Sequence, residues 1–351
     1  MPDDTFTADG ASPLLGLPGA VQASWPDEGV ASHYGDPMRE QRALAGGAAL
    51  VDRSNRGVLM ITGKDRLSWL HSLTTQHLQE LAAGQSAQAL ILSPTGHVEH
   101  HLTLVDDGTT TWVHTEPGAA PALAAFLDSM RFMLRVEVAD LSADAAVLTV
   151  MGPAGGDITA GLEGVLGQVS QEPFGIKDLI VPRERLAGVA AELVGRGAVP
   201  AGMWAFEALR IAARVPRFGL DTDHRTIPHE VGWIETAVHL SKGCYRGQET
   251  VARVHNLGHP PRRLVFLDLD GSVDRLPAHG SPVELDGATI GFTGSAARHY
   301  ELGPIGLGLV KRTVPVDATL LADGVAAAQE VIVPPDAGAN VKVTLRRRQV
   351  I

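Results

Sequence analysis

Cysteine is almost absent from this 351-residue chain, which holds a single one, Cys244. One thiol cannot form an internal disulfide, so a disulfide-stabilised scaffold is excluded. Long apolar runs are missing too, and no stretch approaches the ~18–20 residues of a membrane-spanning helix. Residues 1–30 lack a basic segment followed by an apolar one, so we expect no signal peptide. These absences favour a cytoplasmic protein without a membrane segment.

Positive charge is also scarce, because 29 Lys and Arg stand against 40 Asp and Glu, a net charge of −11. Nonspecific nucleic-acid binding needs cations that neutralise phosphates, so no direct contact with nucleic acid is expected. The basic run at residues 346–348 is the local exception and is typical of a solvated terminus. The composition is otherwise that of a globular protein, and the length suggests two or three domains.

The sequence pattern divides the chain into three parts. Residues 1–40 are rich in Ala, Gly, Pro and Asp without periodicity, and we predict a flexible N-terminal extension there. Strand and helix patterns alternate over residues 41–260. Residues 57–138 give β-α-β-β-α-β with one extra hairpin strand, the split βαβ or ferredoxin-like arrangement. Residues 145–199 repeat that order with a short last strand, which predicts a second lobe.

Beyond residue 260 the helical patterns stop. Short strands punctuated by Gly and Pro follow, and Asp286-Gly287 is a strong signal for a two-residue hairpin. The last two of these strands are predicted at residues 330–333 and 341–345. Residues 261–351 therefore predict a small β-barrel. The predicted fold class is α+β, with two ferredoxin-like lobes and a C-terminal barrel.

Cys244 lies in the run Lys242-Gly243-Cys244-Tyr245-Arg246-Gly247-Gln248-Glu249, just before a predicted helix. The flanking cations and the helix N-terminus favour the thiolate form of this cysteine. The alternative is a small buried side chain in a tight turn, because free cysteine is among the most buried residue types. Local chemistry supports both interpretations equally.

The same run resembles the signature of the YgfZ proteins, relatives of the folate-dependent aminomethyltransferase of the glycine cleavage system, GcvT. Further matches follow in order along the chain, at residues 51–54, 67–75, 209–213, 217–219, 227–230, 291–295 and 305–310. The resemblance covers roughly residues 45–345. It implies a GcvT-like cloverleaf, in which two ferredoxin-like lobes and a barrel surround a folate channel.

One departure from the aminomethyltransferases bears on function. Those enzymes carry paired aspartates after the turn at Gly96, whereas this chain has His97-Val98-Glu99-His100-His101. The resemblance therefore implies a folate-binding factor for assembly or repair of iron–sulfur clusters in client enzymes, tRNA-modifying enzymes among them, rather than an enzyme. The alternative is a folate-dependent one-carbon transferase with His100 or His101 as its base.

The resemblance also implies a set of site residues. Glu230 is the candidate for the pterin edge, unless it forms a structural salt bridge with Arg210 or Arg217. Trp233 is either a stacking partner for the pterin or a core residue. The remaining candidates for tetrahydrofolate, some for its glutamate tail, are Lys242, Arg246, Gln248, Glu249 and Arg253. Gln248 and Glu249 also suit the first turn of a helix.

Cys244 is the predicted functional thiol. Iron–sulfur sites normally use about four thiolates, so a cluster is expected only transiently or shared with iron–sulfur assembly proteins and client enzymes. His97, Glu99 and His101 fall on one face of a predicted strand, but metal sites more usually combine two elements. We therefore expect no resident metal.

Overall fold

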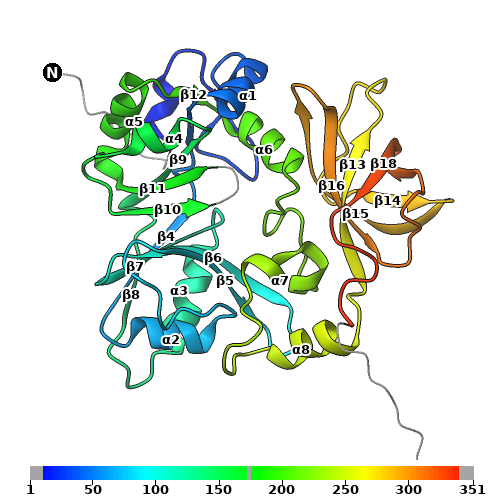
Figure 1. The fold of residues 1–351 in the computed structure, drawn as a ribbon. Helices are drawn as coiled ribbons and strands as arrows, with labels where there is room; N and C mark the ends of the chain where they lie inside the picture. The colour runs from blue at the N-terminus through cyan, green and yellow to red at the C-terminus, as the bar shows by residue number, and fades with distance from the viewer. Residues whose placement is uncertain (1–10, 172–174, 340–351) are drawn as a thin grey trace, which may run out of the picture.

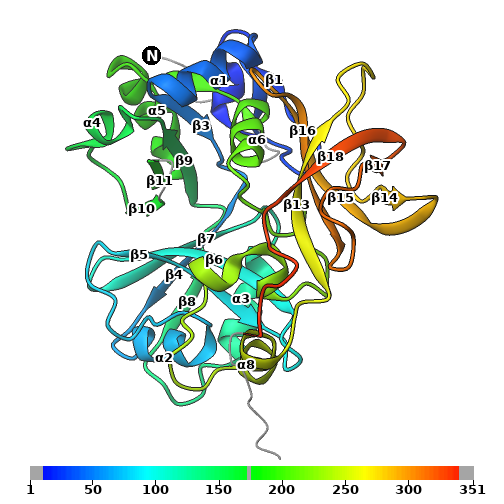
Figure 2. The same cartoon turned by 45° about the vertical axis from the view of Figure 1, so that its right-hand side comes forward.

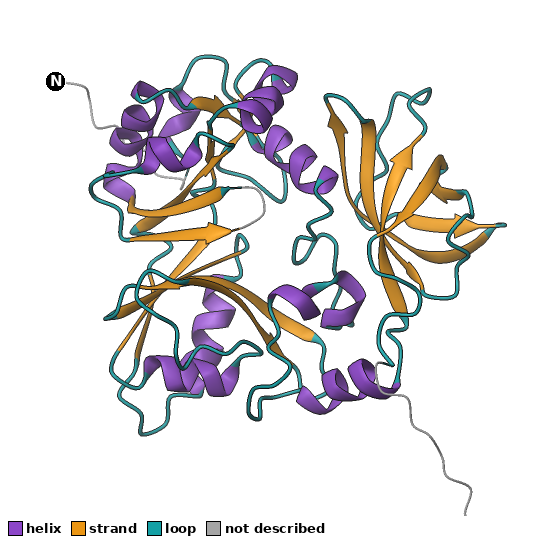
Figure 3. Ribbon diagram, in the orientation of Figure 1, coloured by secondary structure: helices purple, strands orange, loops and turns teal. Residues whose placement is uncertain are grey.

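The computed structural model describes residues 11–171 and 175–339. Within these residues the chain forms two lobes and a separate barrel, which are arranged around a common centre (Figure 1). Each lobe combines one sheet with helices. The predicted α+β fold class is confirmed. Helices cover the outer faces of the two lobes, and the barrel is built from strands alone (Figure 3). No helix in these two described ranges is long and apolar enough to cross a membrane.

The first lobe is one sheet of strand order β5-β6-β7-β4-β8 with two helices on its outer face. The apolar residues of alternate strand positions, such as Leu59 and Leu104, pack against Leu70 and Leu123 of those helices. The elements are β4 (Gly57–Thr62), α2 (Arg66–Leu73), β5 (Ser86–Leu92), β6 (Val98–Asp106), β7 (Thr110–Thr115), α3 (Ala120–Ser129) and β8 (Glu137–Asp140).

The second lobe repeats this plan with one insertion. Its sheet has the order β10-β11-β9-β3-β12, so β3 (Ala49–Asp52), which precedes the first lobe in sequence, lies between two strands that follow it. β3 is antiparallel to β9 and parallel to β12. The other elements are β9 (Ala145–Met151), α4 (Gly155–Thr159), β10 (Gly167–Gln171), β11 (Ile176–Pro182), η2 (Arg183–Arg185), α5 (Leu186–Gly195) and β12 (Val199–Ala201).

The inner faces of the two sheets pack against each other. Val58, Val105 and Trp112 of the first lobe meet Val147 and Ile180 of the second. Nearer the centre of the molecule, the residues on these two faces are polar, such as His114 of β7 and Asp178 of β11. The interface is therefore apolar at one end and charged at the other.

The segment before β3 is ordered from residue 11, so the predicted extension over residues 1–40 is wrong for residues 11–40. Leu14 and Val30 are 4% and 0% exposed. These apolar side chains insert singly between other elements, which leaves no periodic pattern in the sequence. The elements are η1 (Pro13–Gly16), β1 (Val21–Gln22), β2 (Ala31–His33) and α1 (Pro37–Gly46). Residues 1–10 lie outside the described residues.

A central connection joins the lobes to the barrel. It consists of α6 (Met203–Ala212), η3 (Pro228–Val231), α7 (Trp233–Thr236) and α8 (Gln248–Leu257), and crosses between lobes and barrel (Figure 2). One apolar cluster joins Leu90 of the first lobe, Ile211 of α6, Trp233 of α7 and Phe266 of the barrel. The three parts of the molecule therefore share a core at the centre.

The closed barrel has the strand order β13-β16-β15-β14-β17-β18. Its strands are β13 (Arg262–Leu269), β14 (Pro282–Leu285), β15 (Ala288–His299), β16 (Gly303–Lys311), β17 (Leu320–Ala322) and β18 (Val325–Val331). Asp286 and Gly287 connect β14 to β15 with φ of 52° and 76°, the two left-handed positions of a type I′ hairpin turn. The strand predicted at residues 330–333 overlaps only the end of β18, and the one at 341–345 lies outside the described residues.

The packing of the N-terminal segment can be tested at Gly202, which precedes α6. A Cβ at this position would lie 2.3 Å from the backbone carbonyl of Ser32 in β2. Gly202→Ala should therefore lower the free energy of unfolding by about 1–3 kcal/mol in chemical denaturation. Gly156→Ala is the matched control, because a Cβ there has nothing within 4 Å. Equal stability of the two variants would contradict the tight contact with β2.

Candidate functional site

A cavity of about 850 Å³ lies where the lobes, the central connection and the barrel meet. Cofactor sites typically measure ~300–1,000 Å³, so this cavity is large enough for an extended cofactor. Its apolar lining includes Met151 of the second lobe, Leu209 of α6 and Val333 after the barrel. Its polar side chains come from the two lobes and from the central connection.

Trp233 and His101 form a flat part of the cavity wall. Their rings are stacked, with centroids 4.8 Å apart and planes 7° from parallel. Burial lowers the pKa of His101 to about 4, with Glu116 opposing that effect and Arg56 adding to it. His101 therefore presents a neutral imidazole at neutral pH. Its Nε2 lies 3.3 Å from the amide oxygen of Gln88.

A row of side-chain hydrogen bonds continues from this wall into the second lobe. The amide nitrogen of Gln88 donates to the amide oxygen of Gln171 at 3.2 Å. Gln171 in turn donates to Oδ2 of Asp178 in β11 at 2.5 Å. Gln88 and Gln171 line the cavity, so two neutral amides border the stacked rings.

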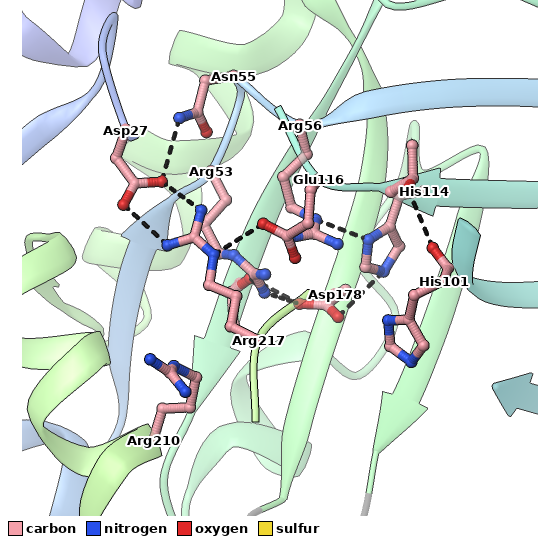
Figure 4. Close-up of polar contacts among 12 residues, drawn as sticks. Asp27, Arg53, Asn55, Arg56, His101, His114, Glu116, Asp178, Arg210 and Arg217 are labelled. Carbon is pink, nitrogen blue, oxygen red and sulfur yellow. Dashed lines mark hydrogen bonds and ion pairs between the residues drawn. The ribbon is translucent and has the colours of Figure 1, made fainter. Parts of the chain in front are cut away.

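His114 on β7 is held between the two lobes (Figure 4). Arg56 Nε donates to its Nδ1 at 2.9 Å, and its Nε2 lies 3.2 Å from Oδ2 of Asp178. Because Nδ1 accepts, the ring proton belongs on Nε2 and faces the carboxylate. Burial and the charge of Arg56 lower the pKa of His114 to about 4, against the opposing effect of Asp178.

Arg217, which follows α6, is the centre of the charged end of the interface (Figure 4). It forms a bidentate pair with Asp27 of the N-terminal segment, at 2.7 and 2.9 Å. Its Nε donates to Glu116, which follows β7, at 2.7 Å. Glu116 also accepts from Arg56 at 2.7 Å. The N-terminal segment, the first lobe and the central connection thus meet at one guanidinium.

The carboxylates of this network stay ionised. Burial acts to raise the pKa of Glu116, but the charges of Arg217 and Arg56 outweigh it and hold the pKa well below its usual range. Burial likewise opposes ionisation of Asp178, yet the bond from His114 and the charge of Arg53 leave its pKa lowered. Each buried charge therefore has an opposite partner, as a buried network requires.

The structure assigns Glu230 a structural role rather than the pterin edge. It is fully buried, and Arg262 at the start of β13 binds both of its carboxylate oxygens at 2.8 and 2.9 Å. One oxygen also accepts from the backbone nitrogen of Ile227 at 3.0 Å. The predicted alternative, a structural salt bridge, is therefore correct, but the partner is Arg262 instead of Arg210 or Arg217.

Lys242 caps a helix and does not line the cavity. Its ammonium donates to the backbone oxygens of His71, Thr74 and Gln76 around the C-terminus of α2, at 3.0 Å for Gln76. An ammonium has three donors, so none remains for a ligand. Burial lowers the pKa of Lys242 to about 8. A role in binding a glutamate tail does not fit this geometry.

Four further residues predicted to contact folate are likewise not among the described residues that line the cavity. Arg246 pairs with Glu99 of β6 at 3.1 Å. Arg253 and Glu249 form an exposed pair on α8 at 2.9 Å. Gln248 is the first residue of α8, the structural alternative considered for it. Of the seven predicted folate contacts, Trp233 is the one that lines the cavity.

Cys244 is exposed, so the buried alternative is wrong. His239 and Ser241 line the cavity, and Cys244 follows Ser241 by three positions, which span at most ~11 Å of chain. The loop is fixed at both ends, by Lys242 and by Gly247, whose missing Cβ would lie 2.6 Å from the carbonyl oxygen of Ser93. The thiol is thus displayed near the cavity on an anchored loop.

The sequence alone did not assign a role to the residues that build the interior of the site. They are Arg53, Arg56, Gln88, Glu116, Gln171 and Asp178. Arg53 lies in a stretch that resembled the family, so motif position was an available signal for this residue. Gln88 and Asp178 lie on strands where one polar residue among apolar ones carries no comparable signal. No group of three or more His, Cys, Asp or Glu in residues 11–171 and 175–339 could hold a metal ion.

Comparison with known proteins identifies the fold. Residues 31–175 match the family described as GCVT N-terminal domain. The glycine cleavage system aminomethyltransferase T from Bartonella henselae superposes with a TM-score of 0.75, at 19% identity, over 92% of this chain and 96% of its own. The fold is that of GcvT. The predicted GcvT-like cloverleaf is thereby confirmed.

Similar sequences extend over most of the chain. An aminomethyltransferase of Geobacillus kaustophilus is 28% identical over 78% of this chain and 82% of its own length. A chloroplastic protein of Arabidopsis thaliana, provisionally named as a transferase, is 25% identical over 82% of this chain and 70% of its own. The chain is thus related in sequence to aminomethyltransferases, and it shares their fold.

The buried histidines predict a loss of stability in mild acid. The pKa values of His101, His114 and His229 are about 4, below the ~6.5 of an unfolded chain. As pH falls from 7.5 to 5.0, the unfolded chain binds protons that the folded one does not, so the free energy of unfolding falls. Each histidine should contribute about 2 kcal/mol to this loss in chemical denaturation.

His114→Gln separates this effect from other titrations. Glutamine can still accept from Arg56 and donate to Asp178, but it does not titrate. The stability lost between pH 7.5 and 5.0 should shrink by about 2 kcal/mol. The carboxylates with lowered pKa lose their stabilising effect mainly below about pH 5, outside this window. If the free energy of unfolding of the variant depended on pH as strongly as that of the parent, the assignment of His114 as a neutral imidazole would be wrong.

Proposed function

We propose that this protein binds a reduced folate, tetrahydrofolate or a derivative, in the central cavity and acts as a YgfZ-like factor in iron–sulfur cluster assembly or repair. Its clients would be iron–sulfur enzymes, with tRNA-modifying enzymes among them. The observation that carries the proposal is the exposed Cys244, displayed on an anchored loop near a cofactor-sized cavity in a GcvT fold. The run of eight residues around Cys244 supports the YgfZ assignment.

The cavity residues fit a reduced folate. A pterin ring is flat, and the stacked Trp233 and His101 supply a flat wall. The edge of a pterin carries both donors and acceptors, as do the amides of Gln88 and Gln171. Bound there, a reduced folate supplies a carrier for one-carbon units. These side chains would orient the ring, and the apolar lining would exclude water.

The exposed thiol suits a transient role. A cluster needs about four thiolates, and residues 11–171 and 175–339 contain one. A cluster or iron ion is therefore a shared substrate, held between Cys244 and a partner protein. The ion pair of Arg246 with Glu99 and the cap by Lys242 keep the loop in place while the thiol faces solvent.

The rival function is folate-dependent one-carbon transfer, which the names of the relatives favour. The candidate bases are His100 and His101. His101 lines the cavity, but a base of pKa about 4 is poorly matched to proton abstraction at neutral pH. His100 lies beside Phe126 of α3 and does not line the cavity. This geometry favours binding over transfer.

We predict folate binding without turnover. Calorimetry should detect binding of tetrahydrofolate, and a coupled assay for methylene-tetrahydrofolate formation should stay silent. Trp233→Leu should weaken binding about 2- to 10-fold, since a stacked aromatic is worth ~0.5–1.5 kcal/mol. Trp204→Leu is the matched control, because Trp204 also packs on a histidine, His33 at 5.0 Å, but does not line the cavity.

Two results would count against this assignment. Absence of binding by the parent protein would remove folate from the proposal. Turnover that His101→Ala abolishes would establish the rival transferase instead.

A separate prediction concerns the thiol. Cys244 should react with iodoacetamide at neutral pH in the native protein, because its side chain is exposed. Cys244→Ser should keep the folate affinity and the stability of the parent, yet fail to restore iron–sulfur enzyme activity in a strain that lacks the protein. Ser241→Ala, in the same loop, is the control and should restore activity. Full complementation by Cys244→Ser would overturn a functional role for the thiol.

A further inference from the structure

After β18 the chain leaves the barrel and returns to the central connection. Figures 1 and 2 show it running from the barrel to α8. We call the last part of this segment, residues 334–339, the strap. Pro334, Ala337 and Gly338 of the strap line the central cavity, as does Val333 just before it. The strap is therefore one wall of the cavity, on the side where the barrel faces α8.

The strap is firmly held only at its beginning. Val333 is 5% exposed, and its nitrogen donates to the carbonyl of Leu264 in β13 at 3.1 Å. Beyond this point each of residues 334–339 is partly or fully exposed, so no buried side chain anchors the strap itself. Segments with few buried apolar contacts open at a low free energy while the rest of the protein stays folded.

The far end of the strap is attached to the C-terminal part of α8. The nitrogen of Ala339 donates to the carbonyl of Val254 at 3.3 Å, and Nδ1 of His259 donates to the carbonyl of Ala337 at 2.9 Å. Gly338 lies between these two bonds with a φ of 87°. A Cβ on Gly338 would lie 2.6 Å from the carbonyl oxygen of Val254. The attachment therefore requires a glycine at this position.

The attached strap encloses a polar side chain that lacks a partner. His229 of η3 is 3% exposed and lines the cavity. Neither of its ring nitrogens has a hydrogen-bond partner among residues 11–171 and 175–339. Its ring centroid lies 6.1 Å from that of His255, the neighbour in sequence of Val254, where the strap is attached. A buried polar group without a partner is unfavourable, so exposure of His229 to water would offset part of the contacts that opening breaks.

We propose that the strap opens and closes this wall of the cavity, by detaching from α8 and pivoting after Val333, and that a ligand exchanges with the cavity through the opening. A ligand that hydrogen-bonds to His229 would favour the closed form, because it supplies the missing partner there. The opening is a property of the cavity wall and does not depend on which molecule the cavity binds.

Histidine modification by diethyl pyrocarbonate, followed by mass spectrometry of the full-length protein, measures the opening without a ligand. In the parent, His229 should react at least ~10-fold more slowly than the exposed His259. Gly338→Ala should raise the rate at His229 about 5- to 50-fold, because the added Cβ detaches the strap from α8. His259→Ala removes only the bond to Ala337 and should raise the rate about 2- to 10-fold.

Gly280→Ala is the matched control. Gly280 also has a left-handed backbone, with a φ of 74°, but a Cβ there has nothing within 4 Å. This variant should leave the rate at His229 unchanged. His114, 1% exposed between the lobes, reports global unfolding, and its rate should be the same in every variant. An unchanged rate at His229 in both strap variants would overturn the opening, and so would an equal rise at His114 in both.

Ligand exchange is tested with tetrahydrofolate, and this step rests on the proposed function. In stopped-flow fluorescence, Gly338→Ala should raise the association and dissociation rate constants about 2- to 10-fold, and Gly280→Ala should change neither. Equal rate constants in the parent and Gly338→Ala would overturn exchange through the strap. If the parent does not bind tetrahydrofolate, the proposed function is wrong, whereas the histidine measurement still decides whether the strap opens.

Discussion

The relative placement of the N-terminal segment, the two lobes and the central connection depends on the buried ion network around Arg217. This guanidinium joins Asp27 of the N-terminal segment to Glu116 of the first lobe, and Glu116 passes the link to Arg56. Arg56 also donates to His114, and His114 lies against Asp178 of the second lobe. Desolvation makes such a network costly, and loss of one partner would strand a buried charge. The network therefore favours one relative placement of the segments that meet at the cavity.

The completeness of this network limits how the cavity can recognise a ligand. Since each interior arginine is already paired with at least one carboxylate, none of them is free to bind a ligand. Recognition in the interior is left to neutral groups, the stacked Trp233 and His101 and the amides of Gln88 and Gln171. The lowered pKa of His101 is consistent with this kind of recognition. A neutral imidazole can stack in a buried site without the cost of removing a charge from water.

Sequence reasoning predicted the elements that depend on local chemistry. The lobes follow from periodic apolar residues, and the hairpin at Asp286 and Gly287 follows from the two left-handed positions that its turn requires. It failed where contacts join distant segments. β3 is separated in sequence from both of its neighbours in the sheet, and residues 11–40 contribute single buried side chains without a period. The partner of Glu230 could not be chosen among several arginines without the three-dimensional placement of Arg262.

The cysteine run shows the same division between what sequence and structure reveal. Lys242 is needed because three carbonyl oxygens around the end of α2 converge on its ammonium. Tyr245 is needed because it is buried in the central core, and Gly247 because its φ of 82° and the contact with Ser93 exclude a side chain. These structural demands account for most of the run but not for Cys244, which is exposed. The anchoring residues are thus best understood as the support that holds this one exposed sulfur in place near the cavity.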